Sequence, residues 1–401
     1  MPTLIMSDTK QLRVLSISTD RDIFREGSEV LERIKDIGTI VDELHIIVFS
    51  KSGFQTTQVA LNVWVYPTNS FSRWLYIFDA YVLAKKMFLK KQEGFAVTSS
   101  LVDLVTTQDP FECGLAGYFI SNKLHIPLHL QIHTDFLNEY FRTHTLLNRI
   151  RVAIAKYLLR GKVNVRVVSE RIKTSILEMF PREKIAPAIT LLPVFVDTQK
   201  FKNAPETRFL SEKYPGYNLL VLVVSRLEKE KNVSLALRLI AEIRSSSIEL
   251  RPGLVIAGRG SEEKHLRSLA KKLHIKDHVF FEGHVSDLPS YYKSADVLLV
   301  TSHYEGYGRM FLEAMVSGCP VLTDDVGAAK EIIGRWNGFV CEEDDEECLL
   351  RNLVSYAKDP AMLDQLKKSA RASAEHFIPK TKEQYLSEFQ KMLKEASERV
   401  D

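Results

Sequence analysis

Short β-rich runs alternate with helical patterns along most of the chain, and this alternation constrains the fold more than any other feature. In the second half, strands are expected at 219–225, 253–258, 279–283, 297–302 and 321–325. The first half repeats the pattern less regularly, with strands expected at 13–18, 43–50, 95–100, 128–133 and 163–169. Strands that alternate with helices are typical of parallel sheets covered by helices. The sequence therefore predicts an α/β protein with two doubly wound, Rossmann-like domains.

A polar stretch separates the two halves and divides the chain into four expected parts. Residues 196–218 contain two prolines and no periodic apolar face, which predicts a linker. It joins an N-terminal domain, 1–195, to a C-terminal domain, 219–377. Residues 378–401 follow as a polar helix that could cross back to the N-terminal domain, with an apolar stripe formed by Tyr385, Phe389 and Met392. Two such domains would face each other across a cleft, and ligands of parallel sheets bind beyond the carboxyl ends of the strands.

Composition argues against several classes of protein. Lys and Arg number 54 and Asp and Glu 51, so the net charge of +3 is too small to favour nucleic acid as the main partner. The four cysteines form no C-x-x-C pair, so neither a zinc site nor a disulfide framework is expected, and a reducing cytoplasm is the simpler environment. The first residues lack a signal-peptide pattern and no apolar run reaches about 18 residues, so a cytoplasmic protein without a membrane span is expected.

The segment 302–320, SHYEGYGRMFLEAMVSGCP, combines a glycine turn with a short helix expected over 309–317. Gly306 and Gly308 let the backbone come close to a ligand. The amide groups in the first turn of the helix lack partners within the helix and, with the helix dipole, form an anion site. A diphosphate fits that description.

Charged side chains flank this expected anion site. Glu305 before the helix and Glu313 inside it could accept hydrogen bonds from the hydroxyls of one sugar-bearing ligand. Arg226 and Lys231, in the loop after the expected strand 219–225, would add charge-assisted bonds to a phosphate, each worth roughly 1.5–3 kcal/mol. Alternatively, the glutamates are a turn residue and a solvated helix residue, and the cations pair on the surface with neighbouring glutamates.

Five segments in a fixed order make the second half similar to a known family. They read SRLEKEKN, IAGRGSEE, FEGHVSDLPSYYKSADVLLVTSHYEGYGRMFLEAM, GCPVLTDDVGAAKEII and NGFV, and they cover about residues 220–341. As a set they resemble the C-terminal domain of the retaining nucleotide-sugar glycosyltransferases of family four, which have the GT-B fold. The resemblance implies an enzyme that moves a hexosyl unit from a nucleoside-diphosphate sugar to a hydroxyl acceptor.

The resemblance also implies roles for residues of the second half. Arg226 and Lys231 would hold the donor diphosphate and act in catalysis. Glu313 would bind the ribose hydroxyls and Glu305 the transferred sugar. The backbone would contact the phosphates or the sugar at Gly308, Arg309, Met310 and Phe311. Loops that would flank the nucleobase carry Gly258, Arg259 and His284. The nucleoside-diphosphate sugar is then a substrate, and no separate cofactor is implied.

The first half resembles the acceptor domain of that family more loosely, through TQDPFECGLAGYFI, LQIHTDFLNEYF, RVVSERIKTSI and LLPVFVDTQKF. His133 would be the cleft histidine, with Asp135 nearby; the alternative is a buried histidine satisfied by a backbone carbonyl. The glycine pair that usually follows the first strand is missing, so Gly27 is the only obvious candidate for close approach to phosphate or acceptor. Asp109 and Glu112 could contact the acceptor or cap a helix.

Mechanism and acceptor are expected to follow the family. The resemblance implies that the anomeric configuration is retained, with the acceptor attacking from the leaving-group face. No Asp-x-Asp pair lies in a convincing metal-binding loop, because the acid pairs at 324 and 344 are adjacent, so a metal-independent reaction is expected. The expected acceptor is a glycan or lipid-linked saccharide of cell-surface polysaccharide synthesis.

Other functions fit parts of the sequence. A dinucleotide-dependent oxidoreductase would need a G-x-G-x-x-G after an early strand, and the sequence has none. A GT-B epimerase or phosphorylase is a further option, and the absence of an obvious cofactor-lysine motif counts against the phosphorylase. The main alternative is a catalytically silent sugar-nucleotide-binding protein of the same fold. Replacing Glu305 by alanine separates these cases, because only a catalyst has turnover to lose.

A helix expected over 147–162 bears on membrane contact. One of its faces carries Leu147, Ile150, Ile154 and Leu158, while Arg149, Lys156 and Arg160 fall within about 40° of one another on another face. Such a stripe could dock on anionic lipid head groups at the cytosolic side of a membrane, and a second basic cluster at 83–92 adds to this option. A solvated outer face is the alternative.

Overall fold

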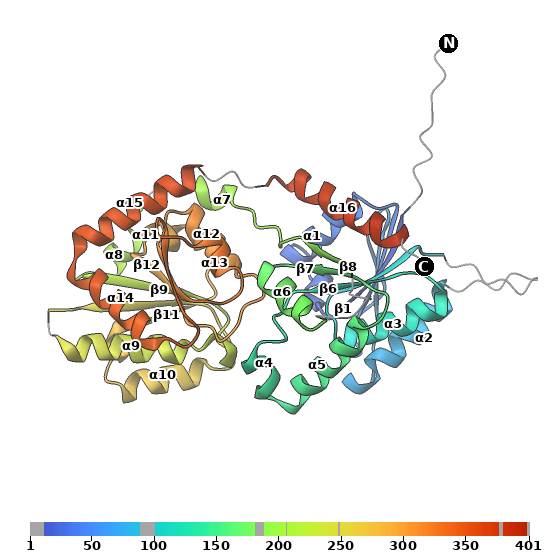
Figure 1. The fold of residues 1–401 in the computed structure, drawn as a ribbon, viewed down its shortest axis with the longest axis horizontal. Helices are drawn as coiled ribbons and strands as arrows, with labels where there is room; N and C mark the ends of the chain where they lie inside the picture. Colours follow the sequence, from blue (N-terminus) through green and yellow to red (C-terminus); the bar gives the residue numbers. More distant parts are fainter. Residues whose placement is uncertain are drawn as a thin grey trace, which may run out of the picture.

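The computed structural model describes residues 12–88, 101–180, 188–205, 207–247, 249–376 and 380–398. These residues form two α/β domains that lie next to each other in Figure 1, each built on its own sheet. The strand expected at 95–100 lies outside the described residues.

The N-terminal domain has, within the described residues, an eight-stranded sheet in the order β3-β4-β2-β1-β5-β6-β7-β8. Its strands are β1 Arg13–Ser18, β2 Glu43–Val48, β3 Thr57–Ala60, β4 Val63–Pro67, β5 Leu104–Thr107, β6 Leu128–Ile132, β7 Asn164–Val167 and β8 Ala188–Leu191. All neighbours pair in parallel except β3 and β4 at one edge, which are antiparallel. Because β1 lies between β2 and β5, the winding of the sheet reverses beside β1.

The C-terminal domain has a parallel six-stranded sheet in the order β11-β10-β9-β12-β13-β14. Its strands are β9 Leu219–Val224, β10 Pro252–Ala257, β11 Val279–Gly283, β12 Val297–Val300, β13 Val321–Asp324 and β14 Gly338–Cys341. This is the Rossmann order, in which the winding reverses between the first and fourth strands, here β9 and β12. The sequence LLVLVV of β9 is apolar throughout because helices cover both faces of this sheet.

Helices cover both sheets. Those of the N-terminal domain are α1 Glu29–Gly38, α2 Tyr76–Phe88, α3 Glu112–Leu124, α4 Glu139–His144, α5 Leu146–Leu159 and α6 Glu170–Glu178, with the 3₁₀ helices η1 Arg21–Phe24 and η2 Arg73–Leu75. The helices that follow are α7 Gln199–Lys202, α8 Phe209–Lys213, α9 Val233–Ser246, α10 Glu263–Lys272, α11 Leu288–Ser294, α12 Arg309–Val316, α13 Ala329–Ile332, α14 Glu346–Lys358 and α15 Pro360–His376, with η3 Lys229–Lys231 and η4 Lys276–His278. Within the described ranges, none of the helices is long and apolar enough to cross a membrane.

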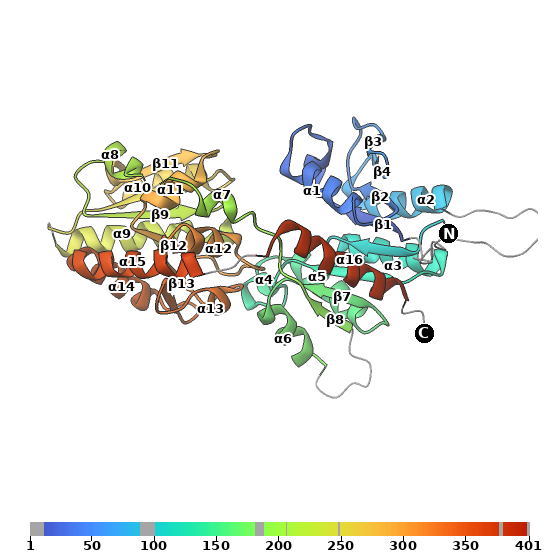
Figure 2. The same cartoon turned by 90° about the horizontal axis from the view of Figure 1, so that it is seen from above.

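The last helix, α16 Lys382–Glu398, lies along the N-terminal domain (Figure 2). Its Phe389 and Met392 are buried in an apolar cluster with residues of the first sheet. Arg166 of β7 donates to the hydroxyl of Tyr385 at 3.0 Å. α16, which follows the C-terminal domain in the sequence, therefore packs on the N-terminal domain and ties the two domains together.

The segment expected to be a linker is more structured than its polar composition indicates. Phe201 and Leu210, on the short helices α7 and α8, are buried in an apolar cluster of the C-terminal domain. The ring of Tyr214 stacks on Phe280 of β11 with centroids 3.7 Å apart. The apolar residues of this segment follow neither a helix nor a strand period, which is why the sequence pattern did not reveal their packing.

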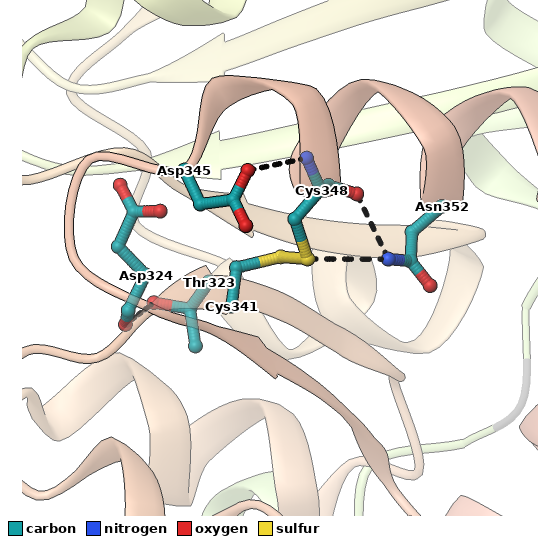
Figure 3. The surroundings of a disulfide bond; sticks show 6 residues. All are labelled: Thr323, Asp324, Cys341, Asp345, Cys348 and Asn352. Carbon is teal, nitrogen blue, oxygen red and sulfur yellow. Dashed lines mark hydrogen bonds between the residues drawn. A yellow bond between two sulfur atoms is a disulfide. The ribbon is translucent and has the colours of Figure 1, made fainter.

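The cysteines correct the expectation that no disulfide forms. Cys341, at the end of β14, and Cys348, in the first turn of α14, are joined by a disulfide that encloses the acidic turn between them (Figure 3). Asp345 caps α14 by accepting from the amide of Cys348 at 2.9 Å. The two cysteines are seven residues apart, a spacing that matches no zinc motif, and it is the fold that brings them together. Cys113 and Cys319 are free and buried.

Beside this disulfide, Asp324 at the end of β13 should make stability depend on pH (Figure 3). Its Oδ1 atom is buried without a hydrogen-bond partner, and burial, with Asp344 and Asp345 nearby, raises its pKa to about 7. The folded protein therefore holds this proton more tightly than the unfolded chain. Stability should fall as pH rises from about 4 to about 7, and Asp324→Asn should remove about 2 kcal/mol of the loss between pH 5 and 8. Chemical denaturation at both pH values measures it; an unchanged pH slope in the variant would contradict the assignment.

Candidate active site

The carboxyl ends of β9 and β12, the two central strands of the second sheet, are where a ligand is expected to bind. In parallel sheets, ligands bind at the carboxyl ends of strands where the winding reverses, and in this domain that point lies between β9 and β12. The loops that follow these strands are joined by hydrogen bonds. The amide of His303 donates to the carbonyl of Glu230 at 2.9 Å, and the hydroxyl of Thr301 donates to the carbonyl of Asn232 at 3.0 Å. The loops therefore form one unit.

The structure brings Lys231 and Glu305 together at this point. Lys231 ends η3 after β9, Glu305 follows β12, and Lys231 Nζ lies 2.7 Å from Glu305 Oε1. Ser302 donates a second hydrogen bond to the same oxygen at 2.8 Å. The side chains of Lys231 and Glu305 are only 13% and 10% exposed, so solvent screens their attraction weakly. An ammonium group has three donors, which leaves Lys231 able to bind a further acceptor.

Gly306 places this pair against the other domain. A Cβ atom at position 306 would lie 1.8 Å from the carbonyl oxygen of His133, which follows β6. Only a glycine allows the two backbones to approach so closely. The structure thus brings Glu305 and His133, which are far apart in the sequence, to facing sides of the boundary between the domains.

His133 is neutral at physiological pH. Burial lowers the pKa of its imidazole to about 3, and the nearby cation of Arg166 adds to the effect. A neutral imidazole can donate one hydrogen bond and accept another. It can thus bind hydroxyl groups without adding a positive charge.

The glycine turn before α12 has the geometry of an anion site. Gly308 precedes the helix with φ +86°, and a Cβ there would lie 2.5 Å from the ring of Phe311. No side chain caps this end of the helix. The amides of Arg309 and Met310 are in the first turn, where backbone donors lack partners in the preceding turn. Phe311 is fully buried and anchors the turn.

Glu313 lies in the second turn of α12 and is held by a residue that sequence reasoning missed. The hydroxyl of Tyr292, on α11, donates to Glu313 Oε2 at 3.0 Å, and both side chains are buried. Arg309 lies 3.7 Å from the other carboxylate oxygen, Oε1. Burial raises the pKa of Glu313, which Arg309 and the bond from Tyr292 partly offset. The carboxylate is therefore oriented through one oxygen, which leaves Oε1 for a ligand. In the sequence, Tyr292 is one of two adjacent tyrosines in LPSYYKSA, and nothing in that segment distinguishes it from Tyr291 as a partner of Glu313.

Arg226 lies at the carboxyl end of β9 but points to solvent. Its guanidinium group is 3.0 Å from Glu230, and its side chain is 72% exposed. An exposed ion pair of this kind contributes little stability, so the arginine can exchange Glu230 for another anion at low cost.

The remaining predicted residues of this domain lie at the same edge of the sheet. Gly258 follows β10 with φ +153°, and a Cβ there would lie 1.8 Å from the carbonyl of Ser225. Arg259 and His284, after β10 and β11, are both exposed. They are available to a ligand that extends along the edge away from β12.

The structure distinguishes among the candidates of the N-terminal domain. Asp109 accepts from the amides of Phe111 and Cys113 at 2.8 and 3.2 Å, so it caps α3 as one of its two expected roles. Glu112 forms an ion pair with Arg151 of α5 at 2.9 Å. Both carboxylates are thus engaged within the domain.

Asp135 and Gly27 differ in their surroundings. Asp135 is buried after β6, and burial raises its pKa against the opposing effect of Arg171. Gly27 is exposed in the turn before α1, with φ +70° and nothing within 4 Å of a Cβ placed on it. The structure therefore gives Gly27 the geometry of a turn glycine and shows no close approach there.

Aromatic contacts that the sequence did not reveal close one side of the domain boundary. The ring of Tyr140, on α4, stacks on His303 at 4.1 Å, and Phe141 meets Tyr304 edge to face at 5.6 Å. Asn138 donates to Glu343 at 3.1 Å, and Arg171 forms an ion pair with Asp325. The loop 303–307 is therefore held from the N-terminal side as well as from its own domain.

Metal ligands do not gather at this site in the part of the chain that the structure describes, where no group of three or more His, Cys, Asp or Glu side chains could hold an ion.

Comparisons with known proteins give the family of the second domain. Residues 205–373 match the family described as glycosyl transferases group 1. The alpha-monoglucosyldiacylglycerol synthase of Streptococcus pneumoniae is 30% identical over 233 residues, which cover 55% of this chain and 51% of that protein. The enzyme of the same description from Acholeplasma laidlawii is 25% identical over 366 residues, 86% of each chain. The chain spans about half the length of the first of these relatives. It spans 24% of another relative, the poly(glycerol-phosphate) alpha-glucosyltransferase of Bacillus subtilis.

Solved structures give the fold. The sucrose-phosphate synthase of Thermosynechococcus elongatus superposes with a TM-score of 0.73 at 16% identity, over 96% of this chain and 98% of that one. HepE of Anabaena, in complex with UDP and glucose, superposes with a TM-score of 0.70 at 19% identity, over 96% and 100%. The predicted fold of two Rossmann-like domains is confirmed, and residues 205–373 match a glycosyltransferase family, as the sequence resemblance predicted.

Proposed function

Because residues 205–373 belong to the glycosyl transferases of group 1 and the chain has the GT-B fold, we propose that this protein transfers a hexosyl unit from a nucleoside-diphosphate sugar to a hydroxyl acceptor. We further propose that the reaction retains the anomeric configuration and needs no metal ion. The observation that carries this proposal is the Lys231–Glu305 pair at the carboxyl ends of β9 and β12, next to Gly306, whose backbone approaches the carbonyl of His133 in the other domain.

The diphosphate of the donor would lie between the loop after β9 and the start of α12. Cleavage of the bond to the sugar leaves negative charge on the diphosphate and positive charge on the anomeric carbon. The amides at the start of α12, the ammonium group of Lys231 and the guanidinium group of Arg226 all attract the charge that develops. They therefore bind the transition state more strongly than the ground state, which accelerates the reaction.

The carboxylates would hold the two sugars at the ends of this diphosphate. Glu313 is oriented by Tyr292 and would accept hydrogen bonds from the ribose hydroxyls through Oε1. Glu305 is oriented by Lys231 and Ser302 and would accept from a hydroxyl of the transferred hexose. The backbone carbonyl of His133 lies beside Gly306, the residue after Glu305, and the neutral imidazole of His133 would contact the same hexose. The acceptor hydroxyl would then attack from the leaving-group face, as retention requires.

Tyr292 gives the first test of this arrangement. Tyr292→Phe removes a hydrogen bond to a buried carboxylate, which is worth about 1.5–3 kcal/mol, so nucleoside diphosphates should bind about tenfold or more weakly. KM for the donor should rise with it while kcat changes less, because the bond acts in both the ground state and the transition state. Calorimetric titration and steady-state kinetics measure these effects.

Tyr291→Phe is the matched control. Tyr291 is the preceding residue on the same helix, but its hydroxyl donates to Glu282. Equal losses of nucleotide affinity in the two variants would indicate that α11 merely becomes less stable, and would contradict a role for Tyr292 in holding Glu313.

The acceptor is proposed from the relatives. Two of them are named as an alpha-monoglucosyldiacylglycerol synthase and a poly(glycerol-phosphate) alpha-glucosyltransferase. We infer that this chain uses a glycan or lipid-linked saccharide of cell-surface polysaccharide synthesis, at the cytosolic face of a membrane with which it makes peripheral contact.

A ligand screen tests the whole proposal. Nucleoside diphosphates of all common bases, and their hexose conjugates, are added at about 100 times the expected dissociation constant, where a bound ligand stabilises the fold by about 2.7 kcal/mol. One base should raise the melting temperature, and its hexose conjugate should be hydrolysed slowly or transferred in the presence of EDTA. Binding without any release of nucleoside diphosphate, also with membrane extracts as acceptor, would indicate the catalytically silent alternative. NMR of the product tests retention.

A further inference from the structure

The N-terminal domain exposes large apolar side chains on two of its segments. Phe71 and Trp74, before and in η2, are 94% and 81% exposed, and Phe78 of α2 is also exposed. On α5, Leu146 is 72% exposed, with Ile150 and Tyr157 exposed beside it. Soluble proteins rarely leave such residues together without a use. These six residues are called the apolar ridge below.

The two parts of the apolar ridge belong to one layer of helices. α3 packs against both α2 and α5, and all three lie on the same side of the first sheet (Figures 1 and 2). Tyr118 of α3 meets Tyr157 of α5 edge to face at 5.8 Å. The side chain of Phe119, next along α3, is itself partly exposed. One extended surface could therefore contact both parts.

The exposed apolar residues of α5 lie on a different face from the one that packs on the domain. The buried residues of this helix are Val152, Ala155, Leu158 and Leu159. Leu146, Ile150 and Tyr157 fall within about 40° of one another on the outer side, at 100° per residue. Arg149, Lys156 and Arg160 form a second stripe about 80° away. The helix thus presents apolar and basic stripes side by side, with no acidic residue between Leu146 and Arg160.

Basic residues accompany the other part of the apolar ridge as well. Arg73 stands in η2, and Lys85 and Lys86 are exposed near the end of α2, where the acid on the same helix is Asp79. Apolar side chains that enter the acyl boundary, flanked by lysine and arginine at the level of the head groups, are the pattern of helices that lie on anionic membranes. A two-fold dimer through the ridge would instead bring the basic stripes of two copies against each other, which is unfavourable.

We propose that the apolar ridge and its flanking basic residues dock this protein on an anionic lipid bilayer, by partial insertion of the side chains of η2–α2 and α5. The inference rests on the proposed function, since it supplies the surface on which a lipid-linked acceptor would be found. α4, directly before α5, contacts the loop 303–307 through Tyr140 and Phe141. A protein docked in this way holds that end of the boundary between its domains near the head groups.

Vesicle flotation tests the docking. The full chain is mixed with vesicles of phosphatidylcholine alone, or with an added third of phosphatidylglycerol. Wild type should float with the anionic vesicles and not with the neutral ones. Two double variants, Trp74→Glu/Phe78→Glu and Leu146→Glu/Ile150→Glu, should each lose at least about tenfold in affinity. The control is Leu61→Glu, which changes a 95% exposed leucine at the β3–β4 turn, outside the ridge, and should bind like wild type.

Several results would overturn the proposal. These are no flotation of wild type, equal flotation with both kinds of vesicle, and variants that float as well as wild type. A wild-type dimer in gel filtration that Ile150→Glu converts to monomer would assign the ridge to a second copy instead. Nucleoside-diphosphate binding, measured on the same preparations without vesicles, should be unchanged in all variants. Loss of docking with intact nucleotide binding therefore separates this inference from the proposed function.

Discussion

Replacing Lys231 by alanine should lower kcat/KM for the donor sugar about 100- to 1,000-fold, the cost of removing one preorganised group that stabilises charge in a transition state. The ammonium group is 2.7 Å from Glu305, and the lysine side chain is only 13% exposed. Solvent therefore screens its charge weakly, and water that enters the variant cannot supply the same stabilisation. The variant also leaves the carboxylate of Glu305 buried with Ser302 as its remaining partner, which should destabilise the fold by a few kcal/mol. Steady-state kinetics and denaturant unfolding measure the two effects separately.

Lys229→Ala is the matched control for this variant. Lys229 lies in the same short helix, two residues away, and its side chain is exposed. Loss of an exposed charge should change kcat/KM by no more than about twofold. If Lys231→Ala also stays within that range, the diphosphate does not bind where we place it.

Gly306→Ala should disrupt the boundary between the domains. The added methyl carbon would lie 1.8 Å from the carbonyl oxygen of His133, a separation that no packing adjustment of side chains can relieve because the obstacle is backbone. The loop 303–307 and the loop after β6 must then move apart by more than an ångström, which misplaces Glu305 relative to His133. Misplacement on this scale costs about 100-fold in rate, while the nucleotide, held by the second domain, should bind almost as before.

The comparison for this variant is Gly334→Ala. A Cβ at position 334 meets nothing within 4 Å, and no positive φ is present there, so activity should remain close to wild type. Similar kinetics for the two variants would mean that the domains need not approach each other at Gly306 during turnover.

The strands that the sequence predicted are the regular, apolar ones. Each strand expected from 219 to 325 appears within about two residues of its predicted bounds. A short, continuous apolar run is typical of a strand in a parallel sheet that is buried on both faces. β5 was missed although it is central. Only Leu104 and Val105 of this strand are apolar; Thr106 hydrogen-bonds to His129 at 2.9 Å and Thr107 to the carbonyl of Asp109 at 3.0 Å. Because hydrogen bonds let these threonines be buried in the sheet, the sequence of β5 shows no continuous apolar run by which the strand could be recognised.

The candidate site could be predicted where a charged residue directly follows a strand that the sequence reveals. Lys231 and Glu305 follow strands that the sequence identifies, and the reversal point between those strands brings them together. Tyr292 was not predictable, because its single polar atom acts only through a contact 21 residues away. The disulfide was not predictable either, since it depends on how β14 meets α14.

The central claim is that the loops at the carboxyl ends of β9 and β12 bind the diphosphate of a nucleotide sugar, and a crystal structure with a bound nucleoside diphosphate tests it most directly. The nucleotide is the one that binds most tightly in the thermal screen. We predict phosphate oxygens within about 3 Å of Lys231 Nζ and of the amides at the start of α12, and a ribose hydroxyl at the same distance from Glu313 Oε1. A nucleotide bound elsewhere on the protein, or the failure of every nucleoside diphosphate to bind at millimolar concentration, would contradict the account.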